Sequence, residues 1–285
     1  EICACLVGSE MCIRDSYNSE RLKYNQMNYN NDVELDNFCS QCLLVINAVG
    51  PSFKINDKIA LHALRNNCHY IDIGGYGILR DLLKPYEKSI EAQKLCFIIG
   101  VGWMPGISGV FSKTIIETHL NSPENTNFNI YYGAVDNWSY SSTYDLAASS
   151  MGKTRSYVYS HGKEIQVSPF RYTHHKFFPF IGHKKICMPS FDEQLTQLAT
   201  SLKQIRKIST FIMLNDYISM GKFMFIKIFY KHNLNKATLM LQDDYQRLVK
   251  KENKWGSVIC QVSKIEPERK IDTFYLSLIH ISEPT

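Results

Sequence analysis

The sequence has no apolar run of about 18 residues, the length that a membrane-spanning helix requires. Its most apolar stretch, residues 211–230, is interrupted by Asp216, Lys222 and Lys227. The chain also lacks an N-terminal basic segment followed by an apolar one, which a secretory signal would show. These absences predict that the protein has no membrane partner, and they favour a cytoplasmic location.

Cysteine is present, but without the spacing of a metal site. Cys39 and Cys42 form one C-x-x-C pair, and no second pair or nearby histidine pair completes a set of zinc ligands. Redox chemistry at the pair is the alternative. Because the pair bridges a predicted helix end and an apolar strand, we expect both side chains to pack as small hydrophobic groups. Scattered cysteines suit a reducing cytoplasm.

Charge does not single out a macromolecular partner. The chain has 285 residues, 45% of them hydrophobic, and a formal net charge of +5. Its lysines and arginines are spread along the chain, with only short clusters at 184–185 and 250–251. This distribution is typical of a solvated basic surface, so no nucleic-acid partner is expected.

Both ends of the sequence resemble translated sequencing adapters. Residues 5–16 read CLVGSEMCIRDS, and residues 276–285 read LSLIHISEPT. We therefore expect 1–16 and 276–285 to be non-native, and they are set aside in predicting the fold. The remaining chain, 17–275, is expected to be incomplete at both ends.

Strand and helix patterns alternate over residues 17–122. Short apolar runs predict buried strands at 43–47, 69–73 and 95–100, and 21–29 is a further candidate. Helical spacing predicts helices at 32–42, 55–64 and 107–120, with Asp32 as the N-cap of the first, and one after Pro85 that buries Tyr86 and Ile90. This alternation predicts an α/β domain with a parallel sheet and right-handed crossovers.

Residues 123–275 have a different pattern, typical of an α+β domain with a mixed or antiparallel sheet. A turn at His161-Gly162 is expected to join two of its strands as a hairpin. Strands are predicted at 128–135, 157–159, 164–167, 208–214 and 255–262, and helices at 143–151, 191–202 and 237–249.

The strand at 43–47 ends in a distinctive run: Asn47, Ala48, Val49, Gly50 and Pro51. Ala48 and Gly50 lack bulk, so a flat ligand could lie against the backbone, and the Asn47 amide can both donate and accept hydrogen bonds. Pro51 blocks continuation of the strand. A tight turn before a helix explains the same five residues, and taken alone they favour that interpretation.

Two further strand ends carry candidate site residues. Asp72 could orient a substrate amine or a ribose, or cap a neighbouring turn, which is slightly favoured. The third strand leads into Gly102, Trp103, Pro105 and Gly106, where glycine permits close approach and a helix N-terminus offers free N–H groups to an anion. The alternative is a helix-start loop with Trp103 packed between domains. Ligands bind at such carboxyl ends in open α/β sheets.

The histidines do not indicate a reaction centre. His62 falls on the polar face of its predicted helix and is expected at the surface. His174 and His175 have no third ligand at suggestive spacing, so we interpret them as a solvated loop pair. No nucleophile with a neighbouring base stands out, and catalytic residues stay unassigned.

Taken together, the motifs INAVGP (46–51), HYIDIGG (69–75) and GVGWMPGISG (100–109) resemble the saccharopine dehydrogenase family. The resemblance covers residues 32–111 and continues loosely to 178–182, which is similar to the family's F-P-x-x-G turn. It implies a partial Rossmann-type NAD(P)-binding domain over 17–122 and a substrate or dimerisation domain over 123–275. A homodimer through the second domain is a possible assembly.

The resemblance also implies roles for the strand-end residues. Family members use NAD or NADP for redox chemistry at a carbon–nitrogen bond, often on amino-acid-like substrates. Cofactor contacts are implied for Asn47, Ala48, Val49, Gly50, Pro51 and Gly102. Substrate contacts are implied for Trp103, Pro105 and Gly106, with Asp72 as a further candidate.

One part of the family pattern is missing. Its first strand, its G-x-G-x-x-G turn and the residue that reads the 2′ position should precede Arg21, where only the isolated Gly8 occurs. The strand at 43–47 is therefore expected to have an unpaired edge, and the chain to bind its cofactor weakly or not at all. We interpret the chain as a fragment of an NAD(P)-dependent oxidoreductase. A non-catalytic nucleotide-binding or dimerisation protein is the alternative.

Overall fold

The computed structural model describes residues 2–5, 25–74, 77–120, 123–152, 156–190, 193–264 and 271–277, with the side chains of 2–5 and Pro123 excepted. The chain divides into two compact units, Glu1–Gly106 (unit 1) and Ile107–Thr285 (unit 2). This division falls before the boundary expected at residue 122. Helix α7 (Ile107–His119), expected to close the first domain, is therefore part of unit 2.

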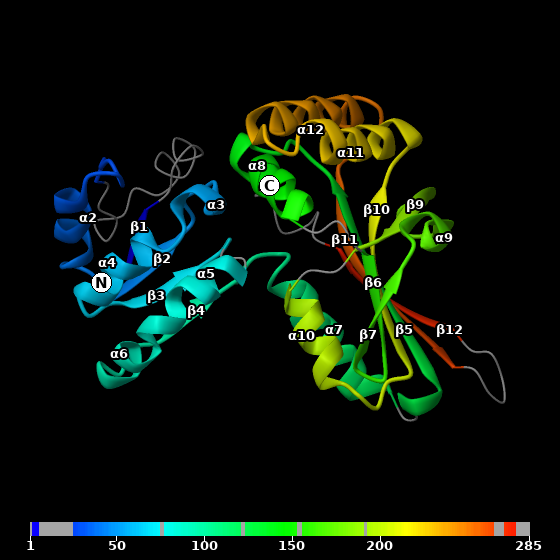
Figure 1. The fold of residues 1–285 in the computed structure, drawn as a ribbon, viewed down its shortest axis with the longest axis horizontal. Coiled ribbons are helices and arrows are strands. Elements are labelled where there is room, and N and C mark those ends of the chain that lie inside the picture. Colours follow the sequence, from blue (N-terminus) through cyan, green and yellow to red (C-terminus); the bar gives the residue numbers. More distant parts are fainter. Residues whose placement is uncertain are drawn as a thin grey trace. The chain divides into compact units, whose positions relative to one another are not determined.

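Unit 1 is an open parallel sheet with accompanying helices (Figure 1). Its strands lie in the order β1-β2-β3-β4, and every neighbouring pair is parallel. The strands are β1 (Ile2–Cys5), β2 (Leu44–Asn47), β3 (His69–Asp72) and β4 (Phe97–Ile99). The helices are α2 (Asp32–Cys39), α3 (Ser52–Ile55), α4 (Lys58–Arg65), α5 (Gly77–Leu83), the 3-10 turn η1 (Lys84–Tyr86) and α6 (Glu87–Ala92). The predicted α/β class and its three strands are confirmed.

The prediction of an unpaired β2 edge is wrong. β1 pairs with β2 in parallel, from Ile2 opposite Leu44 to Cys5 opposite Asn47. The pairing strand, Ile2–Cys5, belongs to the terminal segment that is expected to be non-native. A short run of small and apolar residues can adopt an extended backbone, and its N–H and C=O groups then satisfy those of the exposed edge.

The strand expected at 21–29 is not formed in its described part. Residues 25–28 have no regular structure and Tyr29 lies in a turn, while 21–24 lie outside the described residues. Asn31, rather than Asp32, caps α2: its side-chain oxygen accepts from the Val33 N–H at 3.1 Å. Asparagine favours both turns and N-caps, which explains why this segment turns instead of extending.

The helix after Pro85 also differs from the prediction. Tyr86 is exposed and Ile90 is only partly buried, and neither η1 nor α6 contains a buried residue. The core is covered instead by α5, through Leu79 and Leu83. Cys39 and Cys42 lie in the same core, as expected for small hydrophobic side chains.

His62 is buried, which corrects its predicted surface position. Its side chain is 2% exposed, and its ring nitrogens lie 2.6 Å from Asp36 Oδ1 and 3.5 Å from Asp32 Oδ1. The partners belong to α2, so a polar residue faces another helix without leaving an unsatisfied group. The hydrogen bond with His62 lowers the pKa of Asp36.

We expect His62→Ala to weaken the packing of α4 on α2. The substitution removes a buried hydrogen bond and opens a cavity, so the local loss should be about 1–3 kcal/mol. Hydrogen exchange of the α2 and α4 amides in increasing urea measures it. Arg65→Ala, at an exposed position of α4, is the matched control. Equal protection in both variants would contradict the prediction.

Unit 2 is built on a mixed sheet, as predicted. Its strands run in the order β12-β11-β5-β10-β6-β7, with β9 also pairing β10 and β8. The pair β5–β10 is parallel, and the other described pairs are antiparallel. The strands are β5 (Thr126–Val135), β6 (Ser156–Ser160), β7 (Lys163–Val167), β8 (His174–Phe178), β9 (His183–Pro189), β10 (Lys207–Leu214), β11 (Trp255–Lys264) and β12 (Ile271–Ser277).

The helices of unit 2 form two groups (Figure 1). One contains α8 (Tyr140–Gly152), α11 (Tyr217–Phe229) and α12 (Leu234–Val249), and the other contains α7 and α10 (Glu193–Ser201). The short α9 (Pro169–Tyr172) and the 3-10 turn η2 (Pro123–Asn125) complete the unit. None of the helices that the structure describes is both long and apolar enough to cross a membrane.

Several features of unit 2 test the sequence reading. The hairpin turn is confirmed, with His161 and Gly162 at φ 48 and 73. The turn at 179–182 joins β8 to β9, and β9 precedes the next helix. His174 and His175 lie in β8 rather than in a loop, and His174 is partly buried against the Phe211 ring. Helix α11 was not predicted.

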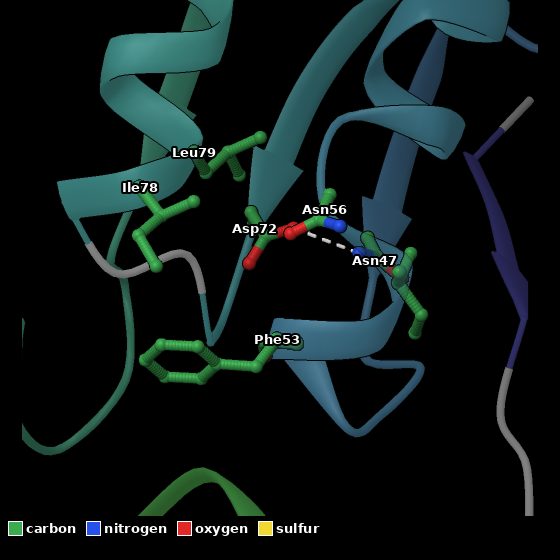
Figure 2. A pocket seen from close by; sticks show the side chains of 8 residues that line it. Asn47, Phe53, Asn56, Asp72, Ile78 and Leu79 are labelled. Carbon is green, nitrogen blue, oxygen red and sulfur yellow. Dashed lines mark hydrogen bonds between the residues drawn. The ribbon is translucent and has the colours of Figure 1, made fainter. Parts of the chain in front are cut away.

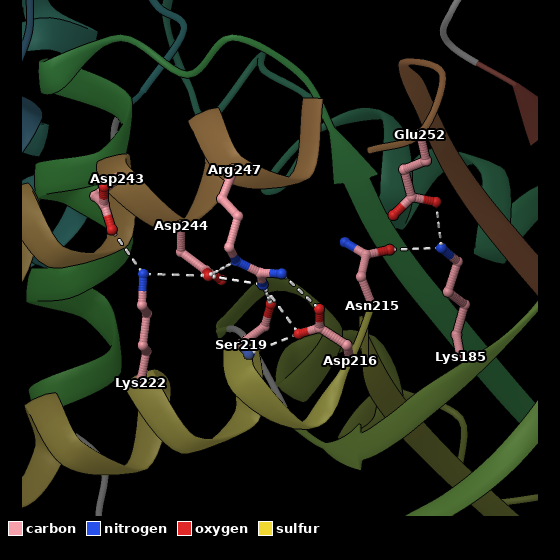
Figure 3. A network of polar contacts seen from close by, with 9 residues as sticks. All are labelled: Lys185, Asn215, Asp216, Ser219, Lys222, Asp243, Asp244, Arg247 and Glu252. Atoms are coloured by element: carbon pink, nitrogen blue, oxygen red, sulfur yellow. Dashed lines mark hydrogen bonds and ion pairs between the residues drawn. The ribbon is translucent and has the colours of Figure 1, made fainter. Parts of the chain in front are cut away.

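A polar network links α11 to α12 (Figure 3). Arg247 donates two hydrogen bonds to the Asp216 carboxylate, at 2.7 and 3.0 Å, and contacts Asp244 at 2.8 Å. Asp216 also caps α11 by accepting from the Ser219 N–H at 2.8 Å. Burial alone would raise the pKa of Asp216, but the bonds from Arg247 and Ser219 outweigh it and lower the pKa to about 2.

This network should give unit 2 an acid-dependent stability. Because the folded-state pKa of Asp216 lies below its ordinary value of 3.8, its contribution is present above that value and is lost as pH falls toward about 2. Thermal unfolding of wild type and Asp216→Asn should therefore differ most near neutral pH and converge as pH falls from about 5 to about 2. Glu124→Gln, an exposed substitution in the same unit, controls for loss of negative charge. A gap that stays constant across this range would refute the assignment.

Candidate functional site

The carboxyl ends of β2, β3 and β4 meet at one edge of the unit 1 sheet. Asn47 lies opposite Asp72, and Asp72 lies opposite Ile99. The backbone pairing extends past the strands, since the Ile73 N–H donates to Asn47 O at 3.2 Å and the Val101 N–H donates to Asp72 O at 3.0 Å. The structure therefore brings the three strand-end motifs side by side.

Asn47 and Asp72 form a buried cluster with Tyr70. Their exposures are 5% and 3%, and Tyr70 is fully buried. Asn47 Nδ2 donates to Asp72 Oδ2 at 2.7 Å, a bond that Figure 2 shows, and to the Tyr70 hydroxyl at 3.0 Å. The Tyr70 hydroxyl donates to the same carboxylate oxygen at 2.6 Å. These donors stabilise a carboxylate that burial alone would penalise.

Tyr70 is held as a neutral donor. Burial raises its pKa far above the ordinary value, and the neighbouring Asp72 carboxylate raises it further. The hydroxyl therefore keeps its proton at neutral pH. Its position suits it to hold Asp72 in place rather than to exchange protons.

Asn47 also shapes the segment that follows β2. Its Oδ1 accepts from the Val49 N–H at 3.0 Å, which closes a side-chain-stabilised turn. Val49 packs in the core and Pro51 is buried, whereas Ala48 is exposed. The segment therefore forms a turn, and Ala48 is the member whose small side chain leaves the backbone accessible.

The glycines of the loop after β4 allow the chain to approach itself. A Cβ on Gly102 would lie 2.6 Å from the Ile73 carbonyl oxygen, and one on Gly106 would collide with Gly102. Gly106 also has a φ of 130, which favours glycine. Pro105 lies in a turn before α7, outside the helix itself. The loop thus needs its glycines for packing on the end of β3, whatever ligand it meets.

Trp103 is the loop residue with unused bonding capacity. Its indole N–H is buried and has no hydrogen-bond partner among the residues that the structure describes. A buried, unpaired donor is unusual in a folded protein. Trp103 therefore carries a donor for which the described residues provide no acceptor.

A small pocket opens beside the Asn47–Asp72 pair (Figure 2). Its free volume is about 10 Å³, roughly the space that one water molecule needs. A ring or sugar would fit only if the surrounding segments moved apart. The lining residues that the sequence reading missed are Ser52, Phe53, Ile55, Asn56, Ile78 and Leu79. The sequence could have indicated Ser52 through Gly74, since a glycine permits another segment to approach closely. In the structure a Cβ on Gly74 would collide with Ser52 Oγ.

Asp72 is the one carboxylate that the described residues place at this edge, and it has no companion metal ligands there. Across the described residues, no three His, Cys, Asp or Glu side chains gather closely enough to hold an ion. The chemistry of this edge is therefore that of a buried carboxylate, amide and phenol, an exposed small side chain and an indole donor.

No protein-family profile and no curated protein matches the chain. Solved structures that align with it include the following three. The dehydrogenase MviM from Clostridium difficile is 7% identical over 85% of this chain and 65% of its own, with a TM-score of 0.34. A candidate oxidoreductase from Magnetospirillum magnetotacticum MS-1 is 9% identical over 81% of this chain and 60% of its own, with a TM-score of 0.32. The candidate oxidoreductase YvaA from Bacillus subtilis is 7% identical over 97% of this chain and 75% of its own, with a TM-score of 0.37.

The chain thus spans less than two thirds of the first two structures. Similarity at these TM-scores does not establish a shared fold. The architecture of the two units rests on the chain's own strand order and register.

We expect Tyr70→Phe to destabilise unit 1. The substitution keeps the ring and removes one donor from the Asp72 carboxylate, so the loss should be about 1–3 kcal/mol. Urea unfolding followed by hydrogen exchange of the β2 and β3 amides measures it. Tyr86→Phe, at an exposed tyrosine of the same unit, should change nothing. A Tyr70→Phe protein as stable as this control would show that the hydroxyl is not needed.

Proposed function

We propose that unit 1 is the nucleotide-binding part of an NAD(P)-dependent oxidoreductase. The observation that carries the proposal is the meeting of three strand ends, two polar and one followed by glycines, at the carboxyl edge of a parallel sheet. Open α/β sheets bind ligands at this edge. The finer assignment, similarity to saccharopine dehydrogenases and action on an amino-acid-like or other small substrate, rests on the motifs at 46–51, 69–75 and 100–109.

The strand order supports the proposal. A Rossmann sheet has the order 3-2-1-4-5-6, which contains the run 1-4-5-6. The order β1-β2-β3-β4 matches that run if β2 corresponds to the fourth strand of the fold. In the order of the chain, the second and third strands of that fold would fall between β1 and β2.

The residues present fit one half of such a cofactor. The exposed Ala48 leaves room for a flat ring against the backbone, and the buried Trp103 N–H would donate to a carboxamide or substrate oxygen only after the loop that follows β4 moved. Asn47 and Asp72 would hold this surface in shape rather than contact the ligand, because they bond to each other and to Tyr70. When bound, the nicotinamide would supply the hydride. The sequence after β1 has no G-x-G-x-x-G turn to hold the pyrophosphate.

Binding of NADPH tests the proposal at Ala48. We expect weak binding, detectable by ligand-observed NMR at millimolar NADPH, because the glycine-rich turn is missing. Ala48→Trp should abolish the signal by filling the surface where the ring would lie. Leu43→Trp is the matched control, since Leu43 is 65% exposed and lies just before the opposite end of β2.

Two results would count against the proposal. If no NADPH binding is detected at millimolar concentration, the chain does not bind this cofactor. If both tryptophan variants lose the signal equally, NADPH does not bind at the carboxyl edge of the sheet. Micromolar binding would contradict only the expectation that the missing turn limits affinity.

The second candidate is a nucleotide-binding protein without turnover. It is favoured by the hydrogen bond between Asn47 and Asp72, because two side chains that bond to each other stabilise the fold rather than act on a substrate. Both candidates predict the same Ala48 result, and a homodimer through unit 2 is compatible with either. NADPH oxidation in the presence of 2-oxo acids and amines distinguishes them, because only the enzyme would consume the cofactor.

A further inference from the structure

Unit 2 contains a second, larger pocket that no part of the proposed function uses. Its free volume is about 590 Å³, within the range of roughly 300–1,000 Å³ that small-molecule sites occupy. One wall comes from the turn between β8 and β9, through Phe180, Ile181 and His183. The other comes from residues 249–257, the end of α12 and the start of β11.

The pocket has an excess of positive charge. Lys250, Lys251 and Lys254 line it and are exposed, but Lys254 forms an ion pair with Asp136 at 3.2 Å, so Lys250 and Lys251 carry the excess. The acidic lining residue Glu252 is already engaged, because the Lys185 ammonium donates to Glu252 Oε2 at 2.9 Å (Figure 3). Lys185 is itself buried, so its charge compensates Glu252 from behind the wall. A ligand in the pocket therefore meets mainly cations.

Trp255 lines the pocket and carries an unpaired hydrogen-bond donor. Its side chain is 8% exposed, and the Lys185 ammonium lies 4.8 Å from the ring centroid. The indole N–H is buried and has no hydrogen-bond partner among the described residues. Because buried donors are nearly always paired, an acceptor on a bound molecule or a water is expected here.

Part of each wall is apolar. Phe180 is 53% exposed, and its ring lies 5.9 Å from that of Tyr275. Ile181 and Val249 are partly buried and pack against the core beneath. An exposed aromatic ring beside aliphatic side chains suits a hydrocarbon or aromatic group.

We propose that this pocket binds a small organic anion with an apolar body. Lys250 and Lys251 attract the carboxylate or phosphate head, Trp255 donates a hydrogen bond to the ligand, and Phe180, Ile181 and Val249 contact the body. The proposal does not depend on nicotinamide binding in unit 1, because every lining residue belongs to unit 2.

Calorimetric titration of the full chain tests the site. The probes are octanoate and octyl phosphate, which share the anionic chemistry but differ in the head group. Octyltrimethylammonium tests the sign of charge, and inorganic phosphate tests the need for an apolar body. We expect both octyl anions to bind, with the tighter one identifying the head group, and the other two probes to bind at least about tenfold more weakly.

Variants localise the binding. Lys250→Gln with Lys251→Gln should weaken the anions about tenfold and reduce the dependence on salt. Lys113→Gln is the matched control, since Lys113 is 62% exposed on α7 and outside the pocket. Trp255→Phe should also weaken binding, because it removes the indole donor while keeping an aromatic ring.

The outcomes decide the proposal. Equal affinity of the double lysine variant and the Lys113→Gln control would overturn it, as would equal binding of the cationic probe. Inorganic phosphate binding as tightly as octyl phosphate would overturn the role of the apolar wall. If Trp255→Phe loses its circular dichroism signal, the double lysine variant still decides, because both lysines are exposed.

Discussion

The buried carboxylate of Asp72 is the constraint on which the unit 1 site depends. A charge that is 3% exposed must be met by donors, and here Asn47 and Tyr70 supply them. The Asn47 amide nitrogen, at the end of β2, is used for the bond to Asp72. Its amide oxygen accepts from the Val49 N–H and closes the turn. Hydrogen bonds to this one carboxylate thus hold the ends of β2 and β3 together, and the turn fixes the position of Ala48.

The same rule recurs elsewhere in both units. His62 is buried against Asp36, which joins α4 to α2. In unit 2 Lys185 is buried against Glu252 and Asn215, and Arg247 joins the Asp216 cap of α11 to α12. Each pair connects segments far apart in sequence. Polar partners therefore specify which elements lie next to each other, while apolar side chains supply the area that they bury.

Glycine at the strand ends has a structural explanation as well as a possible functional one. Gly102 and Gly106 are required because the loop approaches the end of β3 and itself too closely for a Cβ. A loop that packs this closely and a site that holds a dinucleotide both require residues without a Cβ. The exposed Ala48 and the unpaired indole N–H of Trp103 are the features that packing does not account for.

Local patterns in the sequence determined most of the elements. Apolar runs predicted β2, β3 and β4, and helical spacing predicted α4, α7 and α12. Turn chemistry predicted the hairpin at 161–162. These predictions succeeded because periodicity and turn residues report on neighbours within a few positions.

Tertiary structure alone decided the pairings. The sequence does not say that β1 covers the edge of β2, that His62 meets carboxylates on α2, or that Trp255 lies against Lys185. Each depends on a partner tens of residues away or more, and a polar residue on a helix looks solvent-facing until its partner is known. The sequence determined where the strands end, and the fold decided which side chains those ends bring together.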